Sequence, residues 1–288
     1  MKSKFKKIAG GLLLMIGLIV LALPTLLHKA GLHPEYHGEI AQVPAGKRAL
    51  IIATNHSVLS APGETSGDAT GVMASEMTHP YYNFLDAGVE VDIASIKGGE
   101  IPVDPQTLSR IVKTPEDDRF LADSIFLAKV KDSLAIVDVD VTQYDIIFIA
   151  GGWGAAYDLG YSTELGEKIT EAYYADKQAV IGGVCHGVLG LIKVKDRDGN
   201  LLIAGRRMTG VTDKQIKELG IIDITPQHPE AELRKAGVIF ESQTAFRDLF
   251  ATHVVVDDEE RFVTGQNQNS GHETAQKMMA IVAKNSML

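Results

Sequence analysis

Cys185 is the only cysteine in this chain of 288 residues, and it lies in the sequence Gly-Val-Cys-His-Gly at 183–187. An apolar run at 179–184 predicts a strand, and a helix is expected to begin at His186. Such a strand-to-helix turn, the nucleophile elbow, strains the backbone of the nucleophile, and the helix dipole favours the thiolate. The alternative is a buried structural cysteine, which packs like a small hydrophobe. The elbow, its glycines and the adjacent histidine together favour a reactive thiol.

A second glycine-rich turn, Gly-Gly-Trp-Gly-Ala at 151–155, follows a predicted strand at 144–150. Ligand sites in open α/β sheets form at the carboxyl ends of strands. The backbone N–H groups of Gly152 and Trp153, with that of His186, are therefore candidates for holding an oxyanion. The alternative is a turn that needs only flexibility. A phosphate-binding loop is disfavoured because no Gly-Lys-Ser/Thr sequence follows.

Glu76 supplies a carboxylate on a predicted helix, 70–87, whose other residues are mostly apolar. A carboxylate in this setting commonly turns to solvent. If it instead faces the elbow, it provides an acid or base beside the thiol.

The elements expected to position these residues alternate apolar strands with helices, which predicts a parallel sheet covered on both faces. The predicted strands are 49–53, 89–94, 144–150, 179–184, 238–242, 253–256 and 261–264, and the predicted helices are 70–87, 116–131, 163–177 and 271–284. A surface hairpin is expected within 195–210, around the turn sequence Asp-Arg-Asp-Gly-Asn.

The composition excludes several classes of protein. Hydrophobic residues make up 45% and charged residues 23%, as in a globular chain. The net charge is −9, and it is −14 beyond residue 30, where 23 basic side chains face 37 acidic ones. Nucleic acid is therefore disfavoured as a partner. One cysteine excludes an internal disulfide framework and a cysteine-rich zinc module.

Residues 1–30 are predicted to form a membrane anchor. Four lysines precede 8–27, a run of 20 residues without a charge, which is about the length needed to span a bilayer core. The lysines predict a cytoplasmic N-terminus and an extracytoplasmic domain. A cleaved, exported signal peptide is the alternative. Residues 31–47 are predicted to be a solvated linker; His33 and His37 flank Glu35 there, but Pro34 and Gly38 disfavour the helix that a metal site would need.

The domain at 48–288 resembles the DJ/PfpI family, within the class I glutamine amidotransferase-like superfamily. The resemblance is strongest to its glyoxalase III enzymes and heat-shock-type chaperones. The matching segments, in family order, are Thr70-Gly71, Glu76, His79-Pro80, 144–148, 151–152, Gly154, Asp158, 184–187, 209–210 and 263–267.

This resemblance implies a flavodoxin-like sheet and a homodimer. It further implies that Cys185 is the nucleophile, Glu76 its carboxylate partner and His186 the neighbouring histidine. The implied reaction is a lyase-type conversion of methylglyoxal to lactate without glutathione, metal or other cofactor. The thiolate would add to the aldehyde, and Glu76 would move a proton between adjacent carbons before water releases the hydroxy acid.

The sequence departs from the family pattern at two places in the site. Trp153 stands where many relatives have histidine, and Gln215 and Ile216 stand near the place of an acid that orients the histidine. Asp213 or Glu218 is the candidate to complete a Cys-His-acid triad. Two other functions stay open: a thiol amidase or peptidase on the same scaffold, and a membrane-tethered chaperone or redox sensor that uses Cys185 as a switch.

Overall fold

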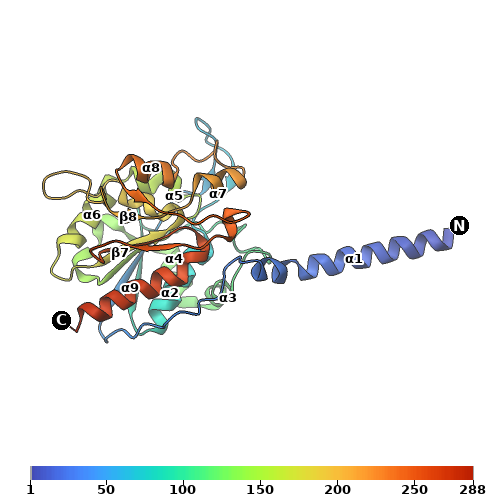
Figure 1. The fold of residues 1–288 in the computed structure, drawn as a ribbon, viewed down its shortest axis with the longest axis horizontal. Coiled ribbons are helices and arrows are strands. Elements are labelled where there is room, and N and C mark those ends of the chain that lie inside the picture. Colours follow the sequence, from blue (N-terminus) through green and yellow to red (C-terminus); the bar gives the residue numbers. More distant parts are fainter. Residues whose placement is uncertain (1, 288) are drawn as a thin grey trace.

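The computed structural model describes residues 2–287, with side chains described at 11, 12 and 14–287. Its centre is a β-sheet (Figure 1). The sheet has seven strands, in the order β10-β11-β7-β6-β1-β4-β5. Neighbouring strands are parallel except β10 and β11. The strands are β1 (Arg48–Ala53), β4 (Glu90–Ser95), β5 (Leu134–Ala135), β6 (Ile146–Ile149), β7 (Val180–Val184), β10 (Val254–Val256) and β11 (Phe262–Gly265). The predicted flavodoxin-like α/β sheet is confirmed.

Helices cover both faces of the sheet, and each face has its own hydrophobic core. Strand β1 shows the alternation that builds them: Ala49, Ile51 and Ala53 face one core, and Leu50 and Ile52 face the other. The helices α2 (Ala74–Asp86), α3 (Pro115–Ala122), α4 (Ser124–Lys131) and α9 (Gly271–Asn285) lie on the first face, and α6 (Thr163–Tyr174) and α8 (Pro229–Lys235) lie on the second.

Smaller elements lie at the edges of this sandwich. The short helices are α5 (Ala155–Asp158) and α7 (Asp213–Glu218), and two-stranded ribbons pair β2 (Val58–Leu59) with β3 (Asp68–Ala69) and β8 (Arg207–Met208) with β9 (Ile239–Phe240). The expected hairpin within 195–210 is reduced to one antiparallel bridge between Lys195 and Leu201.

Two predicted helices have different bounds in the structure. The helix predicted over 70–87 begins at Ala74, because Val72 is extended and forms a parallel bridge with Val103. The helix predicted over 116–131 is two helices that meet at Asp123. The Asp123 carboxylate accepts hydrogen bonds from the N–H groups of Ile125 and Phe126, at 3.0 and 3.1 Å, and so starts α4.

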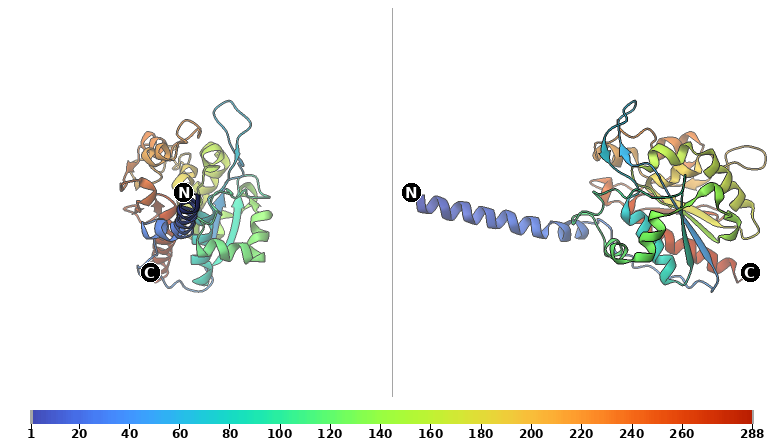
Figure 2. Two further views of the ribbon diagram at one scale, coloured as in Figure 1. Left: turned by 90° about the vertical axis from the view of Figure 1, so that its right-hand side faces the viewer. Right: turned by 180° about the vertical axis from the view of Figure 1, so that it is seen from behind.

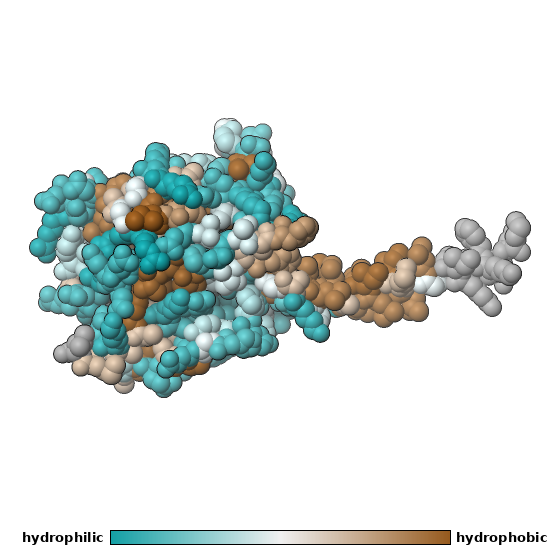
Figure 3. Space-filling model, viewed as in Figure 1, coloured by the Kyte–Doolittle hydropathy of each residue, from teal (hydrophilic) through white to brown (hydrophobic). Residues whose placement is uncertain are grey.

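Helix α1 (Lys2–Lys29) projects from the sheet domain as a single rod (Figure 2). Its described middle part is apolar and exposed, whereas the domain surface carries many hydrophilic residues between smaller apolar areas (Figure 3). In the part of the chain that the structure describes, no helix is long and apolar enough to cross a membrane. The predicted transmembrane helix over 8–27, and the membrane-anchored extracytoplasmic location drawn from it, are therefore wrong.

The last turns of α1 are engaged by the domain. The Arg110 guanidinium donates a hydrogen bond to the carbonyl of Leu21 at 3.2 Å, and Leu27 is partly buried in a domain cavity.

The segment predicted as a solvated linker, 31–47, is also bound to the domain in part. Leu32 is buried, and His33 is partly buried and hydrogen-bonded to Asn269 and Ser75. His37 and Glu35 do stay exposed, as expected for a solvated loop. The prediction that His33 lies in solvent is therefore wrong, because its backbone N–H and its ring both have partners in the domain.

Candidate active site

Cys185 lies in the turn directly after β7, with a backbone φ of +56°. This is the left-handed region, which costs a non-glycine residue about 1–3 kcal/mol unless its surroundings hold it there. Pairing of β7 with β6 and β11 on its two sides fixes the strand that ends at the elbow. The structure thus has the strained nucleophile geometry that the sequence pattern predicts.

The helix after the elbow is a 3-10 helix, Cys185–Leu191, rather than the expected α-helix. The expected lowering of the thiol pKa by a helix dipole does not dominate here. Burial and the negative charge of the Glu76 carboxylate raise the pKa of the Cys185 thiol, and the nearby N–H groups of His186 and Gly152 oppose this only in part.

Glu76 lies in the first turn of α2, fully buried, and it faces the elbow rather than solvent. Neither of its carboxyl oxygens has a hydrogen bond of standard geometry among the described residues. Burial raises the pKa of Glu76 to about 8, although the Cys185 thiol and the N–H groups of Gly151 and Gly152 approach closely enough to oppose the rise. Glu76 is therefore mostly protonated at neutral pH, yet can lose its proton at little cost.

The double glycine of 151–152 is required by close packing, not only by flexibility. A Cβ on Gly151 would lie 2.5 Å from a carboxyl oxygen of Glu76 and 2.8 Å from the nitrogen of His186. Gly152 has φ +93°, and a Cβ there would collide with the backbone at Met73. In the described chain, the N–H groups of Gly152 and Trp153 donate to no acceptor with standard geometry. The N–H of Trp153 is therefore available to a ligand oxygen, whereas the N–H of Gly152 lies close to the Glu76 carboxyl and the Cys185 thiol.

His186 lies beside the thiol, with Nδ1 at 3.5 Å from the Cys185 sulfur. Its ring is fully buried, which lowers its pKa to about 3, so the imidazole is neutral at physiological pH. The Trp153 ring meets it edge to face, with centroids 5.2 Å apart and an interplanar angle of 81°. The Nε2 atom has no partner among the described residues.

Among the described residues, neither Asp213 nor Glu218 forms a hydrogen bond with His186. Asp213 begins α7, where its surroundings are Glu230, His228 and Arg234, and one of its carboxyl oxygens has no described partner. Glu218 accepts a hydrogen bond from the N–H of Asp248 at 2.8 Å. The structure brings Cys185, His186 and Glu76 together, whereas the third member of a Cys-His-acid triad is not formed in the described residues.

A cavity of about 260 Å³ opens onto Cys185, Glu76, Gly152 and Trp153. Sequence reasoning missed several residues of its wall, among them Leu27 and Leu32 from the N-terminal segment. No local pattern marks them, because they reach the cavity only through the fold. Its remaining lining residues are Met73, Asp104, Gln106, Thr107, Ile111, Val112, Gln215, Leu219, Leu249 and Gln268.

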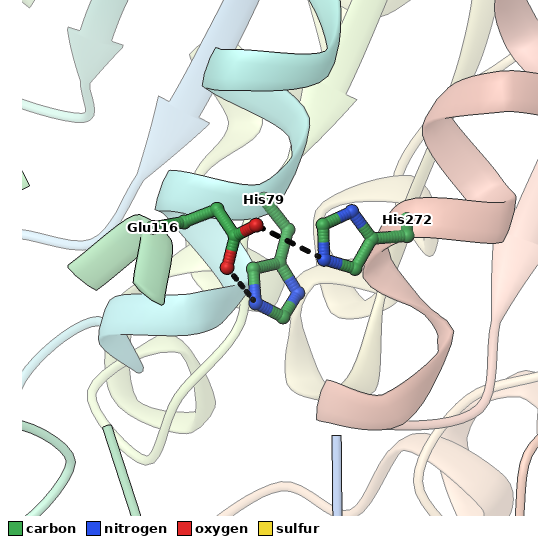
Figure 4. Close-up of side chains that lie close together, drawn as sticks. All are labelled: His79, Glu116 and His272. Carbon is green, nitrogen blue, oxygen red and sulfur yellow. Dashed lines mark ion pairs between the residues drawn. The ribbon is translucent and has the colours of Figure 1, made fainter. Parts of the chain in front are cut away.

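A second group of histidine and carboxyl side chains, which the sequence did not indicate, joins α2, α3 and α9 (Figure 4). The Glu116 carboxylate lies 3.6 Å from Nε2 of His79 and 3.8 Å from Nε2 of His272, and the two rings stack at 3.9 Å. The three ligand atoms lie within 4.8 Å of one another. Two ligands of one zinc ion, each at about 2.0–2.2 Å, lie no more than about 4.4 Å apart. The two carboxylate–imidazole separations lie within this limit.

A hydrogen-bond chain sets the proton position on His272. The Gln276 amide accepts from the N–H of Ala41 at 2.9 Å and donates to the Asn83 oxygen at 2.6 Å. The Asn83 nitrogen therefore donates to the carbonyl of His79 and to Nδ1 of His272, at 2.7 and 2.8 Å. Neutral His272 then carries its proton on Nε2, which faces Glu116. In this tautomer Nε2 has no lone pair for a metal ion, and its N–H faces the Glu116 carboxylate at 3.8 Å, which is longer than a hydrogen bond.

The fold and the elbow define a class of α/β proteins in which a cysteine follows the carboxyl end of a parallel strand. Comparison with known proteins identifies the family within this class. The profile of the DJ-1/PfpI family matches residues 69–281. The chain belongs to the DJ-1/PfpI family.

Individual relatives cover most of the chain. It is 29% identical to glyoxalase 3 of Candida albicans over 75% of this chain and 91% of the relative. It is also 29% identical to the glutathione-independent glyoxalase HSP31 of Saccharomyces cerevisiae, over 80% and 96%. Rapid Encystment Protein 24 kDa of Francisella tularensis is similar in structure, with a TM-score of 0.74 and 33% identity over 82% of this chain and 99% of that protein. The crystal structure of Candida albicans glyoxalase III matches with a TM-score of 0.72 and 27% identity, over 81% and 96%.

Proposed function

We propose that this protein is a glutathione-independent glyoxalase that converts a 2-oxoaldehyde such as methylglyoxal to the 2-hydroxy acid, with Cys185 as nucleophile and Glu76 as general acid and base. One observation carries the proposal: a fully buried carboxyl with a pKa of about 8 lies beside a cysteine held in a strained turn. Relatives named glyoxalase 3 and glutathione-independent glyoxalase support the substrate class.

In the first step the Cys185 sulfur forms a bond to the aldehyde carbon, C1. The thiol proton passes to the ionised form of Glu76, which burial makes scarce but more basic than an ordinary carboxylate. The aldehyde oxygen becomes an oxyanion that the N–H groups of Gly152 and Trp153 stabilise. It then takes up the proton, which gives a hemithioacetal and regenerates the carboxylate.

In the second step Glu76 removes the hydrogen of C1 as a proton and returns it to C2 through an enediol, while the proton of the C1 hydroxyl moves to the oxygen on C2. C1 is oxidised to a thioester and C2 is reduced to an alcohol, so no external oxidant or reductant is consumed. Water then attacks the thioester carbonyl, the C–S bond breaks, and the hydroxy acid leaves with the thiol restored. A base with a pKa near the working pH suits both directions of this proton transfer.

The amidase or peptidase alternative has less support from the geometry. A hydrolytic Cys-His pair uses the histidine as a base that an acid orients. Here the Nε2 atom of His186 has no partner among the described residues, and burial lowers its pKa to about 3. A neutral, weakly basic imidazole is suited to positioning the thiol rather than to accepting its proton. The homodimer that the family resemblance implies stays a prediction, which light scattering in solution tests.

The test is lactate formation from methylglyoxal by the full chain without glutathione or added metal. Cys185→Ser should abolish lactate formation, and Glu171→Gln, which changes an exposed carboxylate on α6, should retain it. Thermal unfolding of both variants controls for folding. Lactate formation by the Cys185→Ser protein at an undiminished rate would refute the assigned nucleophile.

A further inference from the structure

The catalytic cavity is far more apolar than methylglyoxal requires. Beyond the reactive groups, eight of its lining residues are large and apolar, whereas methylglyoxal offers one methyl group to contact them. These eight are Leu27, Leu32, Met73, Ile111, Val112, Trp153, Leu219 and Leu249.

Two of the eight come from the N-terminal segment, where α1 ends. The chain turns there so that the N–H of Leu32 donates to the carbonyl of Leu27 at 3.1 Å. Leu32 is 4% exposed and Leu27 is partly buried, while Leu26 beside it is 56% exposed. The family profile begins at residue 69, so this part of the wall lies outside the matched region.

The turn is held on the domain by specific hydrogen bonds. The Asn269 side chain accepts from the N–H of His33 at 2.8 Å and donates to the carbonyl of Gly31 at 2.9 Å. The His33 ring is 3.0 Å from the Ser75 hydroxyl, and Ser75 directly precedes Glu76. Residues 31–33 are therefore fixed to the same helix that carries the catalytic carboxyl, and the apolar wall has a defined position relative to Glu76.

We propose that Leu27 and Leu32 form a specificity wall that adapts the cavity to 2-oxoaldehydes whose substituent is larger and more apolar than methyl, such as an aryl group. The proposal rests on the proposed function for the reaction itself. The aldehyde reacts at Cys185, and the substituent fills the apolar part of the cavity. Burial of a larger apolar group lowers the free energy of the bound state in proportion to the area removed from water.

The experiment compares phenylglyoxal with methylglyoxal as substrates of the full chain. The wild-type protein should have a kcat/KM for phenylglyoxal at least tenfold higher. Leu27→Ala and Leu32→Ala should each reduce that ratio at least threefold. Leu26→Ala, the matched control on the exposed side of the same turn, should leave the ratio unchanged. Equal kcat/KM values for the two substrates overturn the proposal. It is also overturned if Leu26→Ala lowers the phenylglyoxal-to-methylglyoxal ratio of kcat/KM as much as Leu27→Ala does.

A binding measurement separates this inference from the proposed function. Trp153 is the only tryptophan, and it lines the cavity, so its fluorescence reports occupancy without turnover. Mandelate, the hydroxy acid from phenylglyoxal, should perturb this fluorescence at a concentration at least tenfold below that needed for lactate, and Leu27→Ala should reduce the difference. If neither aldehyde is turned over, the proposed function fails. The fluorescence titration then still tests whether Leu27 and Leu32 make the cavity select larger apolar ligands. Equal responses to mandelate and lactate overturn it.

Discussion

Two regions of this protein place a glutamate close to histidine, and the surroundings of the two carboxyl groups differ. At the elbow, Glu76 is fully buried without a hydrogen bond of standard geometry. At the junction of α2, α3 and α9, Glu116 is partly exposed and faces the ring nitrogens of both His79 and His272. A carboxyl without partners in a cavity is costly to bury and chemically reactive, whereas a shared carboxylate joins helices. This difference supports the proposed catalytic role of the first region and is consistent with a structural role for the second.

The largest expected effect separates the two glutamates by activity. Glu76→Gln should lower kcat for methylglyoxal by about 100-fold to 10,000-fold, the usual range for loss of a general acid or base. Glu116→Gln should change kcat by less than about threefold, since no part of Glu116 lines the catalytic cavity. Steady-state kinetics on both variants measures this, and similar losses for the two would break the comparison.

The pH dependence of stability should separate Glu76 from the histidines. Its folded-state pKa of about 8 lies above the unfolded value of 4.5, so the folded state binds the extra proton and stability falls as pH rises between these values. The lowered pKa values of His33, His79, His186 and His272 act oppositely, mainly below pH 6.5 and weakly up to about pH 7.5. Between pH 6.5 and 8, the wild-type unfolding free energy should therefore fall by about 2 kcal/mol relative to that of Glu76→Gln, in which the histidine contribution is the same.

Urea unfolding at several pH values checks this slope. Glu76→Gln removes the titrating carboxyl, so its stability should not fall from pH 6.5 to 8 and should rise slightly as the histidines of the unfolded state lose their protons. A slope in the variant equal to that of the wild-type protein would assign the proton to another group.

Asn83 offers a change that affects the second region alone. Asn83→Ala removes hydrogen bonds to the carbonyl of His79, to His272 and from Gln276. The loss of buried partners should lower the unfolding free energy by about 1–3 kcal/mol. Urea unfolding measures the loss, and kcat should stay within about twofold. A large fall in kcat with unchanged stability would place this region in the catalytic machinery.

The smallest effect is expected at Asp213. Because no hydrogen bond joins it to His186 in the described residues, Asp213→Asn should change kcat less than about threefold. The same measurement on Glu218→Gln is the matched control for the other candidate acid. A hundredfold loss at Asp213 would mean that a Cys-His-acid triad forms during turnover.

The elbow and the sheet could be predicted because their signals are local. An apolar run followed by glycines flanking a nucleophile specifies β7 and the turn at Cys185, and alternation along β1 specifies two covered faces. The division of α3 from α4 had a local signal too, the N-cap residue Asp123, but the apolar pattern continues through it. Periodicity alone therefore predicted one helix.

The parts that sequence could not provide depend on contacts between distant residues. The hydropathy of the apolar run at 8–27 predicts a membrane-spanning segment. Hydropathy depends on residue type alone, so it does not report that Leu27 lines the cavity. The wall at Leu32 and the cluster around Glu116 each join segments far apart in the chain. The burial of Glu76, on which its pKa depends, is likewise a property of the folded molecule.

The central claim, that Cys185 bonds to the aldehyde carbon, is tested most directly by acid quenching during turnover of methylglyoxal, followed by peptide mass spectrometry. The account predicts an adduct of one methylglyoxal molecule on the peptide that contains Cys185, absent from Cys185→Ser, together with lactate formed only by the wild-type protein. Lactate formed at the wild-type rate by Cys185→Ser, with no adduct on either protein, would contradict it.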